Sequence, residues 1–207
     1  MSLTIDYFYS PISGYAYLGE PRLREIARSS GALLHYRPMD IVRVFAATDT
    51  TPPFKQSDAR LSYRREDLAR KARTLGLPIN VAPRHWPTDA TLASRVIAAA
   101  AIRGHDPGPV SFALLSAVWA DELDIADPHQ VEQALTRAGL DAASLLEAAE
   151  SAEAAQAVAA NTEAAIAARV FGSPTFLVGG ERFWGQDRLE DLARRLGGTS
   201  GQGAPHA

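Results

Sequence analysis

The sequence predicts an α/β fold with a large all-helical insertion. Residues 4–9 are rich in Ile, Tyr and Phe, as buried strands are, and a turn cluster at 10–14 leads from them into a helix. Residues 171–180 have the pattern of a helix end, a proline, a strand and a turn. Between these two halves, residues 57–170 carry only helical periodicity and helix caps.

The first half continues with alternating elements. A helix is expected from Tyr15 to about Ser29, because its apolar residues fall near helical spacing, and Gly31 is placed to end it. Residues 33–39 alternate as a second strand does, and the short apolar stretch 41–47 predicts a helical turn. A loop rich in threonine and proline follows at 48–53.

The middle segment predicts a series of helices. Ser57 or Asp58 caps the first of them, and Gly76 with Pro78 stops it. A later start is marked by Asp127, followed by proline at the first helical position and by glutamine three residues after the cap. The remaining helices are expected over residues 91–103, 107–122, 128–139, a short stretch after Asp141, and 150–169.

The totals exclude several classes of protein. The chain has 207 residues, 46% of them hydrophobic and 22% charged, and a net charge of −3. This charge gives no reason to expect nucleic acid or an anionic membrane as a partner, and no apolar run reaches the length of a membrane span. The N-terminus lacks the pattern of an export signal, so a cytoplasmic location is expected.

The sequence contains no cysteine. Structural disulfides, thiolate metal sites and thiol–disulfide exchange by the protein's own sulfur are therefore excluded. Any thiol chemistry must use a thiol that arrives with a cofactor. The five histidines show no metal-ligand spacing, so no metal site is expected.

The second half closes the predicted frame. A proline that opens an apolar strand fits an edge strand or a cis peptide bond, because proline cannot donate to a β-ladder. Residues 181–183 are expected to return as a strand, and 184–188 to open the final helix. This order is that of the thioredoxin fold, with a discontinuous domain over 1–56 and 171–196, a helical insertion over 57–170 and a disordered tail over 197–207.

Two motifs give the resemblance to a family. SPISGYAYLG at residues 10–19 and FGSPTFLVGGERFWGQDRLEDL at 171–192 resemble the 2-hydroxychromene-2-carboxylate isomerases, relatives of kappa-class glutathione transferases and of periplasmic disulfide oxidoreductases. The resemblance spans nearly the whole chain. The first motif departs from the family pattern Ser-Pro-Tyr-Ser-Tyr, since Gly14 and Ala16 replace its proline and second serine.

Ser13 is the candidate catalytic residue. From the residues alone it stands where a strand turns into a helix N-terminus, a place that favours an anion, and it could equally be only an N-cap. The resemblance implies that Ser13 hydrogen-bonds the sulfur of bound glutathione. A hydroxyl donor there stabilises the thiolate, which is the nucleophile. Ser10 is the alternative hydroxyl.

The resemblance also implies residues that bind glutathione. Ser173, before a cis Pro174, would pair its backbone with the cysteinyl part of the tripeptide; a trans proline in a loop is the alternative. Asp187 and Arg188 would hold the γ-glutamyl end, although an acid at that helix start could simply compensate the helix dipole.

Thr50, before the insertion, and Arg60, at its start, complete the predicted glutathione-binding residues. Thr50 falls where relatives often carry asparagine and would contact the cofactor through its hydroxyl. Arg60 falls where relatives carry lysine and would meet the carboxylate of the glycyl end or of the substrate. The alternative for Arg60 is an exposed arginine on a helix that carries several.

The substrate pocket is expected to be aromatic. Tyr15 and Trp86 would form its wall, and Asp89 lies near a position where relatives have asparagine, with helix capping as its alternative role. The resemblance implies a homodimer that acts on a small aromatic substrate.

Three functions are compatible with these residues. The first is a glutathione-dependent isomerase of the type that converts 2-hydroxychromene-2-carboxylate to trans-o-hydroxybenzylidenepyruvate by reversible thiolate addition. The alternatives are a kappa-like glutathione transferase or peroxidase, and a cysteine-free thioredoxin-fold binding module without catalysis.

Overall fold

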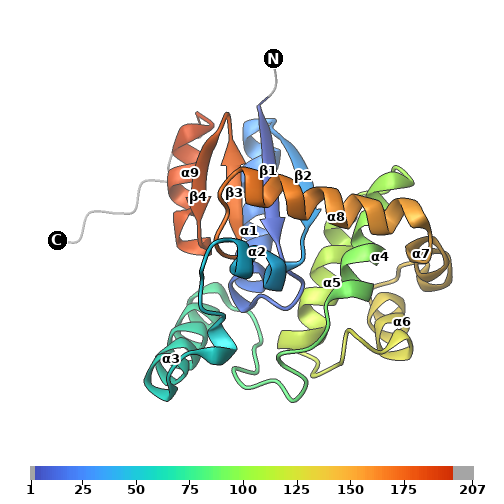
Figure 1. Cartoon of the computed structure of the whole chain (residues 1–207), viewed down its shortest axis with the longest axis horizontal. Helices are drawn as coiled ribbons and strands as arrows, with labels where there is room; N and C mark the ends of the chain where they lie inside the picture. Colours follow the sequence, from blue (N-terminus) through green and yellow to red (C-terminus); the bar gives the residue numbers. More distant parts are fainter. Residues whose placement is uncertain (1–2, 198–207) are drawn as a thin grey trace.

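The computed structural model describes residues 3–197. The predicted tail lies outside these residues, apart from residue 197. Figure 1 shows one sheet with helices on both faces and a group of helices beside it. Within the described residues, no helix is both long and apolar enough to cross a lipid bilayer.

Four strands form a mixed sheet in the order β2-β1-β3-β4. They are β1 (Thr4–Tyr9), β2 (Leu33–Pro38), β3 (Thr175–Val178) and β4 (Glu181–Trp184). β1 pairs in parallel with β2, while β3 is antiparallel to both β1 and β4. The parallel pair needs the long helical crossover that the first half supplies, whereas Gly179 and Gly180, both at positive φ, turn the β3–β4 hairpin tightly.

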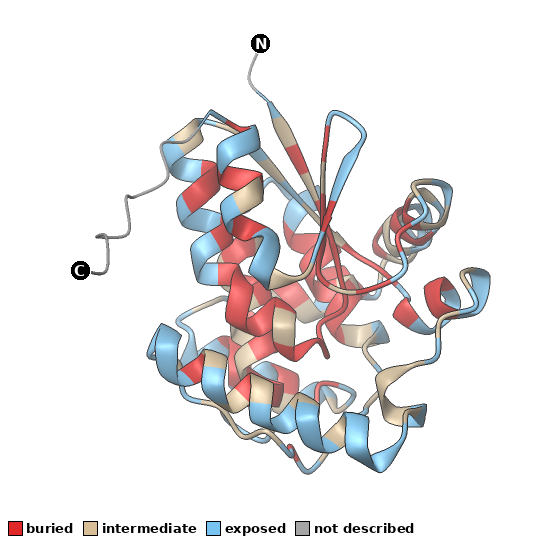
Figure 2. Cartoon of the chain, turned by 90° about the vertical axis from the view of Figure 1, so that its left-hand side faces the viewer, coloured by how far each residue is buried: buried red, intermediate tan, exposed pale blue. Residues whose placement is uncertain are grey.

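Helices cover both faces of the sheet. α1 (Gly14–Ser30) and α9 (Leu189–Arg195) contact each other on one face. α2 (Ile41–Ala47) and α8 (Ala152–Ala167) lie together on the other, as Figures 1 and 2 show. Gly31 ends α1 in the left-handed conformation with φ 66°, as predicted. The α/β fold with a helical insertion is confirmed.

The insertion is helical throughout its regular elements. α3 (Asp58–Leu75) lies apart from the others, beyond one end of the sheet in Figure 1. Of the other helices, α4 (Thr91–Ile102) packs against β2, and α8 covers a face of the sheet. The remaining three pack with α4 as one cluster: α5 (Pro107–Trp119), α6 (Pro128–Arg137) and α7 (Ala142–Ala149). Asp127 and Asp141 cap α6 and α7 as expected.

Some boundaries differ from the predictions. The stretch 41–47 is a full helix, because the Asp40 carboxylate accepts from the N–H groups of Val42 and Arg43. α5 stops at Trp119, three residues early, and Glu122 beyond it has a φ of 55°. The last helix does not open at 184–188. β4 includes Trp184, Gly185 turns the chain at φ 99°, and a 3₁₀ turn over Gln186–Arg188 precedes α9.

A buried carboxyl lies between α1 and the sheet. Glu20 is 1% exposed and its Oε1 accepts a hydrogen bond of 2.9 Å from the Tyr36 hydroxyl. Tyr7 and Tyr9 stack beside Tyr36, with 4.1 Å between their own ring centroids. Burial raises the pKa of Glu20 to about 7, since the charged form loses hydration that the hydrogen bond from Tyr36 only partly replaces.

Glu20→Gln should change how stability depends on pH. The folded-state pKa is raised above the unfolded value, so wild-type stability is fully present below the unfolded pKa and falls as the pH rises to about 7. The amide does not titrate. We therefore expect the free energy of unfolding of the variant, relative to that of the wild type, to increase by about 2–3 kcal/mol from pH 4.5 to pH 7.5. Urea unfolding across this pH range measures the difference. If the free energy of unfolding depends on pH in the same way for both proteins, ionisation of Glu20 does not destabilise the fold.

Candidate functional site

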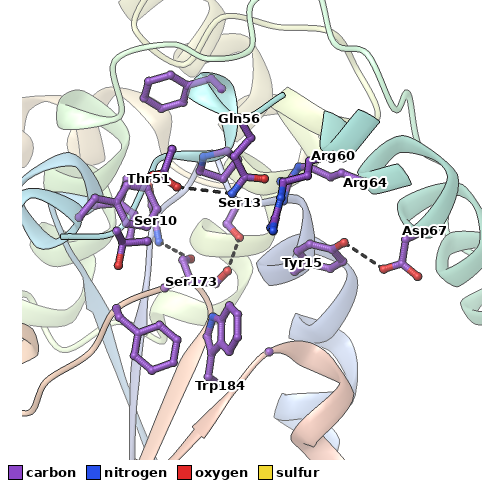
Figure 3. Close-up of a pocket in the computed structure, with 18 of the residues that line it drawn as sticks. Ser10, Ser13, Tyr15, Thr51, Gln56, Arg60, Arg64, Asp67, Ser173 and Trp184 are labelled. Atoms are coloured by element: carbon purple, nitrogen blue, oxygen red, sulfur yellow. Dashed lines mark hydrogen bonds between the residues drawn. The ribbon is translucent and has the colours of Figure 1, made fainter. Parts of the chain in front are cut away.

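One large cavity lies where β1 ends and α1 begins. Its volume is about 970 Å³, and it is bounded by the loop after α2, by one side of α3, and by the segments around residues 171–173 and 184–188. Figure 3 shows the side chains that face it. Eight of the ten predicted site residues line this cavity: Ser13, Tyr15, Thr50, Arg60, Trp86, Ser173, Asp187 and Arg188.

Ser13 both caps α1 and faces the cavity. Its Oγ accepts from the Ala16 N–H at 3.2 Å and donates to the Ser173 carbonyl at 3.0 Å, with the residue 8% exposed. The two roles considered for Ser13 are thus compatible. The N–H groups of Gly14 and Tyr15 belong to the first turn, where no carbonyl of the helix can accept from them, so the partial positive charge of the helix N-terminus is directed at this spot.

The Ser173–Pro174 peptide bond is cis, as one of the two sequence interpretations required. Ser173 Oγ accepts from the Ser10 N–H at 3.0 Å, while its carbonyl accepts from Ser13. Pro174 itself is not among the cavity-lining residues, but its carbonyl accepts from the Gly185 N–H at 2.9 Å. The cis-proline segment is therefore fixed from both sides, to β1 and to the turn after β4.

That turn carries the predicted acid–base pair. Asp187 and Arg188 are both exposed and lie 3.7 Å apart, from carboxylate Oδ2 to guanidinium Nη2. A Cβ at Gly185 would collide with Asp187 Oδ1, and the φ of 99° at Gly185 is one that other residues rarely adopt. Glycine at 185 therefore lets the Asp187 carboxylate approach the backbone beside the cavity.

The side chains of α3 form the opposite wall. The Tyr15 hydroxyl donates to Asp67 Oδ2 at 2.9 Å, and the pKa of Tyr15 is raised by burial first and by this hydrogen bond second. Tyr15 therefore stays a neutral phenol. Arg60 is exposed and lines the cavity. Thr50 lines it too, with its hydroxyl hydrogen-bonded to Thr48 Oγ1 at 3.0 Å.

Two predicted site residues follow α3, and only one of them, Trp86, lines the cavity; Asp89 does not. Trp86 lines the cavity and its indole N–H donates to the Ile12 carbonyl at 3.0 Å. Asp89 is not among the lining residues. Its carboxylate accepts from the Thr91 hydroxyl and N–H, at 2.6 and 2.9 Å, and these bonds lower its pKa. Ala90 is the N-cap of α4, and Asp89 before it holds the first helical residue, Thr91, so Asp89 supports the helix start and does not line the cavity.

Sequence reasoning missed Arg64, which lines this cavity, and Trp119, which packs behind Arg64 and lines a smaller neighbouring cavity. Arg64 contacts three aromatic rings, with its Cζ 5.0, 5.4 and 5.9 Å from the ring centroids of Tyr15, Trp86 and Trp119. Its position four residues after Arg60 on a predicted helix places both on one face, and this spacing could have identified it. No sequence signal marked Trp119, which reaches the site from the end of α5.

Trp119 explains the glycine in the first motif. A Cβ at Gly14 would lie 3.1 Å from Trp119 Cε2 and Cζ2 and 3.1 Å from Leu68 Cδ2. The proline ring that the resembling family carries here would need still more of that space. Gly14 therefore accommodates the Trp119 ring beneath the start of α1.

Gly14→Ala should destabilise the protein although alanine is the better helix former. The added methyl group meets two buried side chains, and overpacking of this kind costs about 1–2 kcal/mol, more than alanine's propensity gains at a first-turn position. Chemical denaturation measures the difference. The same change in a Trp119→Phe background should cost less, and a variant as stable as the wild type would contradict the close contact.

Comparisons with known proteins identify the family. The model of the DsbA-like thioredoxin domain matches residues 4–197. The chain is 28% identical over 198 residues to a 2-hydroxychromene-2-carboxylate isomerase of Sphingobium xenophagum, covering 95% of this chain and 99% of that one. The isomerase of the same name from Pseudomonas putida is 28% identical over 206 residues, covering 98% of each.

Solved structures agree with these matches. A 2-hydroxychromene-2-carboxylate isomerase structure superposes with a TM-score of 0.75 at 26% identity, covering 94% of each chain. A probable DsbA oxidoreductase from Streptomyces coelicolor gives a TM-score of 0.74 at 18% identity, covering 99% of this chain and 94% of that one, which shows a shared fold. The predicted resemblance is confirmed.

Proposed function

The chain belongs to the family of DsbA-like thioredoxin domains, and from this premise we propose that it is a glutathione-dependent isomerase of an aromatic ring-cleavage intermediate. The relatives named 2-hydroxychromene-2-carboxylate isomerase support the reaction class, since the chain covers nearly all of their length. One observation supports a thiol cofactor: a serine hydroxyl faces a cavity at a helix N-terminus in a chain that has no cysteine.

The residues present fit a thiol cofactor. Ser13 has one hydroxyl proton, which the Ser173 carbonyl accepts, and rotation about the Cβ–Oγ bond can redirect it to a sulfur anion. The helix N-terminus adds fixed positive potential at the same place. Glutathione supplies a thiol whose ionised form adds reversibly to a conjugated double bond, which lets that bond rotate. The protein's part is to hold the sulfur ionised near neutral pH.

The cavity also offers partners for the rest of the tripeptide. The backbone of Ser173 before cis Pro174 is suited to pair with the cysteinyl part, as an added strand does. Asp187 and Arg188 provide opposite charges for the ammonium and carboxylate of the γ-glutamyl end. Arg60 and Thr50 also line the cavity. Arg60 is assigned to the glycyl carboxylate, and Thr50 to a contact with the cofactor through its hydroxyl.

Ser13→Ala tests the proposed role directly. Without the hydroxyl, the pKa of the bound glutathione thiol should return toward its free value, and the rate of isomerisation at neutral pH should fall about 100- to 1000-fold. Ultraviolet titration of the thiolate in the complex measures the first effect, and turnover of 2-hydroxychromene-2-carboxylate the second.

Ser10→Ala is the matched control, since Ser10 also lines the cavity but its hydroxyl has no hydrogen-bond partner in the structure. Its thiol titration should match that of the wild type. Unchanged turnover in Ser13→Ala would refute the assignment. Glutathione consumed in proportion to product would identify a transferase instead of an isomerase, because an isomerase regenerates its thiol.

Asp187→Asn tests the cofactor's orientation. Loss of this exposed carboxylate should weaken glutathione binding about 5- to 10-fold and leave the pKa of the bound thiol unchanged. Titration calorimetry measures the affinity. Glu190→Gln, which removes a nearby acid that pairs with Arg22 outside the cavity, should bind as the wild type does. Equal weakening in both variants would indicate a general effect of charge.

A further inference from the structure

Arg64 sits in an aromatic enclosure beside the cavity. The rings of Tyr15, Trp86 and Trp119 surround its guanidinium at 5.0–5.9 Å, and Figure 3 shows it projecting from α3 toward Ser13 and Tyr15. The side chain is half-buried and lines the 970 Å³ cavity. A guanidinium held against ring faces is oriented, because cation–π contact fixes its plane.

This cation has no anionic partner among the described residues. Asp67 is the nearest candidate on α3, but its Oδ2 accepts from Tyr15 and its Oδ1 pairs with Arg70 at 3.0 Å. Neither a hydrogen bond nor an ion pair joins Arg64 to any described side chain. Burial lowers the pKa of Arg64 and the charge of the Asp67 carboxylate raises it, so the charge of this cation is only partly compensated. A bound anion would restore that compensation.

The surroundings select the kind of anion. A second cavity of about 270 Å³ shares Phe54, Arg64 and Trp86 with the large one, so apolar surface borders the guanidinium on more than one side. An aromatic ring can pack against these walls while a carboxylate meets the planar donor fork. Arg60, by contrast, is exposed at the rim and has no described aromatic contact.

We infer that Arg64 is the specificity-determining residue that binds the carboxylate of the aromatic co-substrate, which leaves Arg60 to the cofactor. The inference rests on the proposed function and deepens it, because it names the residue that binds the carboxylate of the substrate. Tyr15 supports the site as a neutral phenol that Asp67 holds in place, with its ring against the guanidinium.

Paired substrates test this assignment. With saturating glutathione, Arg64→Gln should raise KM for 2-hydroxychromene-2-carboxylate about 10- to 100-fold and change KM for its methyl ester less than about 3-fold. Arg64→Lys, which keeps the charge but not the planar fork, should fall between the wild type and Arg64→Gln. Arg73→Gln, an exposed change farther along α3, should leave both constants unchanged.

The inference is overturned if Arg64→Gln changes KM equally for the acid and the methyl ester, or leaves KM for the acid unchanged. Thermal unfolding and glutathione calorimetry of each variant establish that fold and cofactor binding are intact. Should Arg64→Gln fail to fold, the acid-to-ester ratio in Arg64→Lys decides the same question.

A binding measurement separates this inference from the proposed function. Calorimetry of the wild-type protein with cinnamate and with methyl cinnamate needs no turnover. If the enzyme converts neither chromene substrate, yet cinnamate binds at least 10-fold more weakly to Arg64→Gln while the ester does not, the proposed reaction fails and the carboxylate site stands. Equal binding of cinnamate to both proteins overturns the site, whatever the activity.

Discussion

The hydrogen bond from the Ser13 hydroxyl to the Ser173 carbonyl joins the two ends of the fold. It links residues 160 positions apart, at the N-terminus of α1 and at the cis-proline segment before β3. The same oxygen accepts from the Ala16 N–H and so caps the helix. A hydroxyl can do both because it donates once and accepts twice. The group proposed to ionise a thiol is therefore also the one that aligns the helix with the sheet.

The absence of cysteine changes what this frame can do. Solved structures named as DsbA oxidoreductases share the fold at low identity. This chain has no cysteine, and it places a serine at the turn from β1 into α1. Serine keeps the helix N-terminus available to an anion without competing as a nucleophile. On the proposed function, the sulfur would come from the cofactor, which would be regenerated in each turnover.

Both halves of the fold line the cavity. The thioredoxin-like half supplies hydroxyls, backbone groups and the Asp187–Arg188 pair, together with aromatic rings such as Tyr15 and Trp184. The insertion supplies the arginines of α3 and the Trp86 and Trp119 rings around Arg64, which suit an aromatic anion. On the proposed function, the frame would determine the cofactor and the insertion would determine the co-substrate.

Local sequence patterns were enough to predict the order of elements, most of their bounds, and a candidate site at the turn from β1 into α1. Glycine, proline and capping residues act locally, so Gly31, Asp127 and the Ser173–Pro174 step could be interpreted without coordinates. Which side chains meet across the site depended on tertiary packing. Trp119 fills the space beside Gly14 from a helix about a hundred residues away. Such a contact depends on packing between distant segments, which local patterns do not encode.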